Sequence, residues 1–162
     1  MTTVYLGIGS NVDRERHIEH AVSLLRSLGE QIKLSTIYQS EAVGFKSEPF
    51  YNLVLEMKTA LNLQDFSLAL REIEFHCGRD SQAKKFEART IDLDILLFGD
   101  AVSDSKPELP RSDIYRYPFV IQPLYELCPE LILPNDGRTV RAVWHQAKDL
   151  HLLDEVKPWF NP

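Results

Sequence analysis

The chain contains 162 residues, with 18 Lys or Arg against 24 Asp or Glu and a formal net charge of −6. This length predicts one domain, residues 1–162, because hydrophobic cores seldom divide below about 250 residues. The acidic balance argues against nonspecific binding to nucleic acid or to a membrane surface, since both need a basic footprint. No apolar run approaches the roughly 20 residues of a membrane span. The two cysteines, Cys77 and Cys128, give no sign of a disulfide framework and favour a reducing, cytoplasmic location.

Hydrophobic periodicity divides the first hundred residues into six elements. Alternating or continuous apolar residues predict strands, and apolar residues spaced three and four apart predict helices. Gly29 and Gly78 are expected to end the two helices. In chain order we predict a strand over residues 4–8, a turn over 9–11, a helix over 18–28, strands over 32–38 and 51–59, a helix over 64–77 and a strand over 91–98.

This β-α-β-β-α-β order predicts the fold class. It is typical of an α+β, ferredoxin-like sandwich, in which helices pack on one face of an antiparallel sheet. Two further short helices are expected over residues 119–127 and 139–147, bounded by prolines. They would form a C-terminal extension of the sandwich.

Two acidic residues interrupt the last predicted strand. Asp92 and Asp94 are two positions apart, so their side chains share one face, about 6.6–7 Å apart along the strand. Paired carboxylates on an apolar strand repel each other and resist desolvation, and a divalent cation such as Mg²⁺ would offset this cost. The alternative is that both lie on a solvated face of the sheet. The opposite face is expected in the core and consists of Ile91, Leu93, Ile95 and Leu97.

A basic segment precedes this strand. Residues 79–89 contain Arg79, Lys84, Lys85 and Arg89 against two acids, whereas residues 92–108 contain five acids and one lysine. A cationic loop beside paired carboxylates suits a polyphosphate, because metal ions and basic side chains together neutralise its oxygens. The alternative is an ordinary solvated, charged loop.

Two further patterns carry weaker signals. Gly7 and Gly9 follow a strand and precede a helix, but Val12 stands where a dinucleotide-binding loop has its third glycine, so we interpret them as a tight turn. The aromatic residues Tyr115 and Tyr117, with Phe119, could line a pocket for a planar ligand or simply pack near the prolines.

Taken together, the motifs resemble the 6-hydroxymethyl-7,8-dihydropterin pyrophosphokinase family over nearly the whole length. Most specific is the segment RTIDLDILLFG at residues 89–99. The others are YLGIGSN at residues 5–11, PFYN at 49–52, Glu74 with Gly78 and Arg79, FVIQPL at 119–124 and CPEL at 128–131.

The resemblance implies a reaction and its catalytic residues. Members of the family transfer pyrophosphate from ATP to the hydroxymethyl oxygen of a dihydropterin in folate biosynthesis, and they release AMP. By similarity, Asp92 and Asp94 would hold two Mg²⁺ ions that bridge the triphosphate. Arg79 and Arg89 would contact the phosphates, with Lys85 beside them.

The resemblance also assigns the two substrates to residues. The pterin ring would stack between Phe50 and Phe119 and bond Asn52 at its edge, with Ser40 and Val43 as further contacts. The nucleotide contacts implied are Glu74, Lys85, Arg89, Ile95 and Arg111. The partners expected are therefore ATP and a dihydropterin, with no nucleic acid and no membrane, on a monomeric chain.

The chain departs from the family pattern at several positions. Glu87 stands two positions before the signature arginine, Arg111-Ser112 replaces the usual His-Pro or His-Tyr pair, and Tyr117 occupies a position where a basic residue is usual. Ser40-Glu41 stands where the family commonly has Thr or Ser followed by Pro. These changes leave an alternative open, namely a divergent paralogue that binds pterin or nucleotide with altered or lost transfer. An RNA-binding module of the same strand order is disfavoured by the acidic charge.

Overall fold

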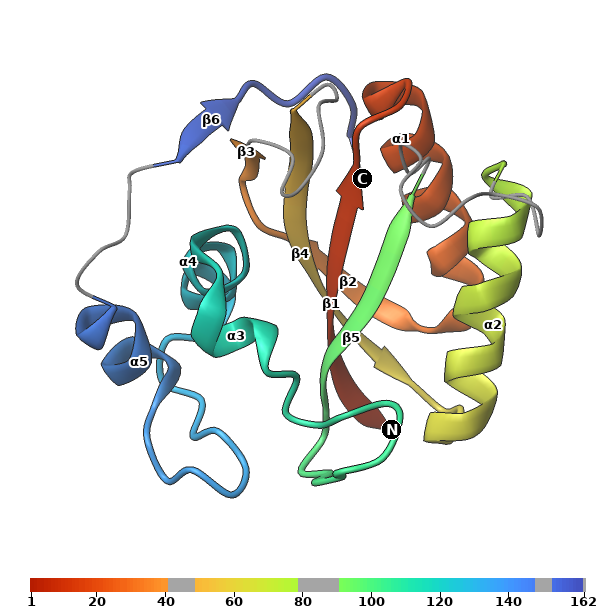
Figure 1. Cartoon of the computed structure of the whole chain (residues 1–162). Coiled ribbons are helices and arrows are strands. Elements are labelled where there is room, and N and C mark those ends of the chain that lie inside the picture. The colour runs from red at the N-terminus through yellow and green to blue at the C-terminus, as the bar shows by residue number, and fades with distance from the viewer. Residues whose placement is uncertain (41–48, 79–90, 148–152, 162) are drawn as a thin grey trace.

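The computed structural model describes residues 1–40, 49–78, 91–147 and 153–161. Strands from these ranges form one six-stranded sheet in the order β5-β1-β4-β3-β6, with β2 also beside β4 (Figure 1). Every strand pair is antiparallel, as the ferredoxin-like prediction requires. The strands are β1 (Thr2–Ser10), β2 (Glu30–Leu34), β3 (Ile37–Ser40), β4 (Phe50–Thr59), β5 (Asp92–Phe98) and β6 (Asp154–Val156).

The predicted strand over residues 32–38 is present as two shorter strands. β2 pairs with the second half of β4 and β3 with its first half. The break falls at Ser35, whose hydroxyl accepts a hydrogen bond from Val54 N at 2.9 Å while its own N–H donates to Val54 O. A side chain thus replaces one backbone acceptor, and the chain stays attached to β4 through the bend.

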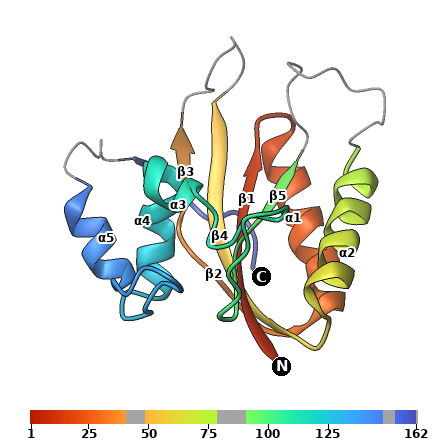
Figure 2. The same cartoon turned by 60° about the horizontal axis from the view of Figure 1, so that its bottom comes forward.

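Helices cover both faces of the sheet (Figures 1 and 2). The two helices predicted within the first hundred residues lie on one face of the sheet, as expected. The C-terminal extension covers the other face, where α3 was not anticipated. The first layer contains α1 (Arg14–Leu25), a short 3-10 turn (Arg26–Leu28) and α2 (Leu63–His76), and the second contains α3 (Asp113–Arg116), α4 (Pro118–Leu127) and α5 (Val140–Gln146).

Strand alternation divides the apolar residues into two cores. In β4, Leu53 and Leu55 belong to the core under α1 and α2, whereas Val54 between them packs against the C-terminal helices. Both layers therefore need apolar residues from the same strand. Because both faces are covered, β4 is apolar at consecutive positions instead of alternating with polar ones.

A bulge in β5 corrects one sequence prediction. Opposite Tyr5 and Leu6 of β1, the register jumps from Leu97 to Ile95, which leaves Leu96 as an extra residue. Beyond this point the alternation shifts, so Leu97 lies with Leu96 in the second core and not with Ile95 in the first. Before the bulge the parity is as predicted, and Asp92 and Asp94 share a face.

The cysteines and the helix lengths are relevant to two predictions, that the chain has no disulfide framework and no membrane span. Cys77 and Cys128 are both buried and free. Within the described ranges, none of the helices is long and apolar enough to cross a membrane.

Candidate active site

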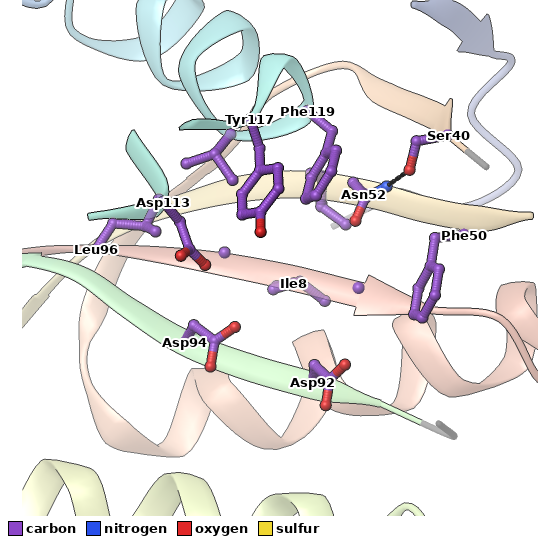
Figure 3. A pocket seen from close by; sticks show the side chains of 14 residues that line it. Ile8, Ser40, Phe50, Asn52, Asp92, Asp94, Leu96, Asp113, Tyr117 and Phe119 are labelled. Atoms are coloured by element: carbon purple, nitrogen blue, oxygen red, sulfur yellow. Dashed lines mark hydrogen bonds between the residues drawn. The ribbon is translucent and has the colours of Figure 1, made fainter. Parts of the chain in front are cut away.

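A pocket of about 250 Å³ lies on the sheet face that the C-terminal helices partly cover (Figure 3). Its floor comes from β1, β4 and β5, and its upper wall comes from α3, α4 and the residue between them. The lining residues are Gly7, Ile8, Gly9, Ser40, Phe50, Asn52, Leu53, Asp92, Asp94, Leu96, Asp113, Tyr117, Phe119 and Val120.

The two glycines of β1 form the floor of this pocket. Gly9 pairs with Asn52 on one side and with Asp92 on the other, while Gly7 pairs with Asp94. A Cβ atom on Gly9 would lie 3.1 Å from Asn52 Oδ1, which is tighter than nine in ten real Cβ contacts. The interpretation as a tight turn is wrong, because β1 continues to Ser10. The missing side chains keep open the space between the amide and the carboxylates.

Asp92 and Asp94 both line the pocket, at the start of β5. Both are partly exposed, and the Asp94 side chain is 35% exposed, so the pair is neither buried nor on a fully open face of the sheet. Burial raises the pKa of Asp94, and the nearby carboxylate of Asp113 raises it further, although Arg111 acts in the opposite direction. This end of the pocket therefore holds negative charge in partly desolvated surroundings, where a cation is favoured.

Arg111 supplies a cation to this cluster. Its Nη2 lies 3.7 Å from Asp94 Oδ1, and its Nε donates to Asp113 Oδ2 at 2.9 Å. Burial lowers the pKa of the Arg111 guanidinium, but the two carboxylates outweigh this effect and raise the pKa. The predicted nucleotide contact Arg111 is thus close to the predicted metal ligand Asp94.

The other end of the pocket is aromatic. Figure 3 shows Phe50 and Phe119 flanking the space in front of Asn52. The amide of Asn52 donates to Ser40 Oγ at 2.6 Å and is 8% exposed, so its orientation is fixed. Tyr117 stacks on Phe119 with ring centroids 5.0 Å apart and planes 16° apart. Such a slot suits a flat, polar-edged heterocycle.

Two predicted nucleotide contacts lie behind the pocket instead of on its wall. Glu74 of α2 is 2% exposed, and its Oε2 accepts a hydrogen bond from Leu93 N at 3.0 Å. It also pairs with Arg71. Ile95 is 5% exposed and belongs to the core under α1 and α2. In this arrangement Glu74 anchors the backbone between the two aspartates.

The remaining predicted residues lie outside the described ranges. They are Val43, Arg79, Lys85 and Arg89, together with Glu41 and Glu87 among the departures from the family pattern.

The sequence prediction missed one residue of the pocket wall and left the place of three aromatic residues open. Asp113 was not anticipated, since its only sequence signal is its position two residues after Arg111. Among the aromatic candidates, Tyr117 and Phe119 line the pocket, but Tyr115 does not. Tyr115 is 44% exposed and donates to Asp136 Oδ2 at 2.8 Å.

An aromatic slot beside a carboxylate pair suits a flat heterocycle bound next to a metal-bound anionic group. Comparison with known proteins gives the particular family. Residues 5–129 match 7,8-dihydro-6-hydroxymethylpterin-pyrophosphokinase (HPPK), and the chain belongs to this family. The resemblance stated from the motifs is confirmed.

Curated relatives agree with this assignment. The 2-amino-4-hydroxy-6-hydroxymethyldihydropteridine pyrophosphokinase of Aquifex aeolicus is 40% identical over 137 residues, covering 83% of this chain and 85% of that protein. The protein of the same name from Bacillus subtilis is 34% identical over 132 residues, covering 78% of each chain.

Solved structures agree on the fold. The wild-type HPPK-DHPS of Plasmodium falciparum, with STZ-DHP, matches with a TM-score of 0.72 at 13% identity. The match covers 90% of this chain and 43% of that one, so this chain spans less than half the length of that protein.

Proposed function

We propose that this chain transfers pyrophosphate from ATP to the hydroxymethyl group of 6-hydroxymethyl-7,8-dihydropterin and releases AMP, as a step of folate biosynthesis. The observation that carries the proposal is one pocket in which the carboxylate pair and the aromatic slot share a floor (Figure 3). Membership of the pyrophosphokinase family supports the reaction type. The curated relatives carry the name of this activity.

The pterin occupies the aromatic end of the pocket. Phe50 and Phe119 would contact the two faces of its ring, where stacking contributes about 0.5–1.5 kcal/mol beyond area burial. Asn52 would contact the ring edge through its amide oxygen, because its N–H₂ group already donates to Ser40. The oxygen is directed toward the floor on which the ring would lie (Figure 3). This pose directs the hydroxymethyl group along the floor toward β5.

The carboxylate end fits magnesium by the chemistry of its donors. Asp92 and Asp94 offer hard oxygen ligands, and Mg²⁺ is commonly held by one or two carboxylates plus phosphates and water. Among the described residues no group of three or more metal-ligating side chains is assembled, and in this proposal the nucleotide would supply the remaining ligands. Bound there, magnesium would neutralise phosphate oxygens during transfer.

The chain's own residues then position the reactants. The pocket fixes the acceptor by stacking and by Asn52, while Glu74 holds the backbone that carries both aspartates. Arg111, beside Asp94, is placed to turn from that carboxylate to a phosphate when the nucleotide arrives. Positioning of this kind can supply several kcal/mol of the barrier reduction.

The test is an AMP-forming assay. Purified protein with ATP, Mg²⁺ and 6-hydroxymethyl-7,8-dihydropterin should produce AMP and pterin diphosphate in equal amounts. Asp92→Ala and Asp94→Ala should each abolish turnover and leave circular dichroism unchanged, while the exposed control Asp104→Ala retains activity. Pterin binding without AMP would overturn the proposal.

That negative result would support the second candidate, a divergent binding protein. The contact of Arg111 with Asp94 favours this alternative, because a guanidinium beside a metal ligand opposes cation binding. We also infer a monomer in the cytoplasm, the location being supported by the two free buried cysteines.

A further inference from the structure

The C-terminal segment, residues 153–161, runs over the end of the sheet at which β1 ends and β4 begins (Figure 1). It follows the part of the chain that matches the family, which ends at residue 129. Within it, β6 adds to the edge of the sheet by pairing with β3, and Asp154 lies opposite Gln39. The next residue of β3, Ser40, is the one that holds the Asn52 amide.

After β6, two aromatic residues also attach the C-terminal segment to the core. Trp159 and Phe160 pack against the core under α1 and α2. The Trp159 ring lies 5.9 Å from that of Tyr51, at an interplanar angle of 38°. The Tyr51 ring is therefore in contact with the C-terminal segment on the sheet face opposite the pocket.

Tyr51 is also held from the N-terminal side. The Arg14 guanidinium lies 3.9 Å from the centre of its ring, and Arg14 Nη1 donates to Pro49 O at 2.8 Å. One tyrosine thus joins the start of α1, the start of β4 and the C-terminal segment.

The contact between Trp159 and Tyr51 matters for the pocket because of where Tyr51 lies in β4. It stands between Phe50 and Asn52, whose side chains line the pocket on the other face. Because neighbouring side chains of a strand point to opposite faces, fixing the Tyr51 ring fixes the backbone that aims both pocket residues.

We propose that Trp159 is a positioning residue for pterin binding, acting through Tyr51 on Phe50 and Asn52. The inference rests on the proposed function, because it takes the aromatic slot to be the pterin site. Trp159 is not itself among the residues that line the pocket. Its indole N–H is buried and finds no hydrogen-bond partner within the described ranges, so its contact with Tyr51 is one of ring packing.

The test compares the two tryptophans of the chain. Trp159→Ala should raise KM for the dihydropterin about three- to tenfold, the loss expected for one aromatic pair. KM for ATP and kcat should stay within about twofold, since the carboxylate end is not supported by this contact. Trp159→Phe, which keeps a ring, should restore most of the pterin affinity.

Trp144→Ala is the matched control. Trp144 is also partly buried and stacks on Tyr125 at 5.4 Å, but it lies on α5 and lines no part of the pocket. This variant should leave both KM values unchanged. Equal effects of the two alanine variants, or a rise in both KM values for Trp159→Ala, would overturn the inference.

Two further measurements keep the outcome unambiguous. If Trp159→Ala is unfolded at the assay temperature, Trp159→Leu preserves apolar packing without the ring, and an unchanged pterin KM in that variant would overturn the inference. Asn52→Ala separates the two claims. Loss of pterin affinity in Asn52→Ala but not in Trp159 variants removes only the positioning role, whereas no AMP from the wild-type protein removes the proposed function.

Discussion

Asn52 and Asp92 flank the same residue, Gly9, from the two strands on either side of β1. Two strand spacings, about 9.5 Å, therefore separate the backbone of the residue proposed to read the pterin edge from that of a proposed magnesium ligand. The distance is set by backbone pairing and not by loops. A bound heterocycle that reaches from one to the other must pass over Gly9.

Substitution of Gly9 should therefore interfere with substrate binding without unfolding the chain. In Gly9→Ala the new Cβ would meet Asn52 Oδ1 at 3.1 Å, which forces the amide to shift. We expect KM for the dihydropterin to rise about tenfold, equivalent to about 1.4 kcal/mol. Gly7→Ala is the comparison, because its Cβ would also enter the floor but would meet nothing closer than Leu96 at an ordinary 3.6 Å, so the pterin KM should rise less. Similar pterin KM values for the two variants would contradict the steric explanation.

Neutralising Asp94 should stabilise the metal-free protein while removing activity. Burial raises the pKa of Asp94 above the ordinary carboxyl value of 3.8, so folding favours its protonated form. The protonated Asp94 carboxyl contributes this stability fully below the ordinary pKa of the unfolded chain. The contribution is lost as the pH rises through the raised pKa of the folded protein. Asp94→Asn lacks this loss and should therefore have a higher Tm than the wild-type protein at neutral pH.

The measurement is thermal unfolding of both proteins with a chelator over an acid-to-neutral series. The difference in Tm should be small below the ordinary carboxyl pKa and should widen as the pH rises. A constant difference would mean that the titration of Asp94 is not responsible.

Glu74 should matter for stability as well as for activity. In Glu74→Ala the buried Leu93 N–H loses the acceptor that lies 3.0 Å away, which costs about 1–3 kcal/mol in unfolding free energy. Glu74→Gln retains an amide oxygen and should lose less. Glu72, an exposed neighbour on α2, serves as the control. Urea unfolding decides the matter, and a Glu74→Ala variant as stable as Glu72→Ala would contradict the anchoring role.

Arg111 should affect metal and nucleotide in opposite directions. Removing its charge from beside Asp94 leaves that carboxylate to the cation, so Arg111→Ala should need less Mg²⁺ for half-maximal activity. The same change removes a phosphate contact and should raise KM for ATP, by about tenfold for a charge-assisted bond. Steady-state kinetics at varied Mg²⁺ and ATP test both effects. A higher Mg²⁺ requirement would show that Arg111 supports the metal ligand instead of competing for it.

Sequence periodicity predicted the sheet and the shared face of Asp92 and Asp94, because alternation along a strand is a local property. The prediction from periodicity failed where a single residue interrupts the alternation of side chains along a strand. The extra Leu96 moved Leu97 to the other core, and Ser35 divided one predicted strand into two. Such features depend on the partner strand and leave no periodic signal of their own.

The pocket shows the same division between local and long-range information. Motif resemblance identified residues on β3, β4 and β5 before their contacts were known. It did not reveal Asp113, whose place at the pocket depends on how α3 docks on the sheet. Nor did it suggest that Glu74 would bond the Leu93 backbone, a contact that joins residues 19 positions apart.

The bulge at Leu96 separates β5 into two functional halves. The half before it presents Asp92 and Asp94 to the pocket, and the half after it contributes Leu97 to the layer that holds α4. The sheet face to which side chains point is set separately in each half. A residue gained or lost beyond the bulge would therefore repack the C-terminal helices, but it would not turn the carboxylates into the core. The strand can therefore change at its structural end while its chemical end stays in place.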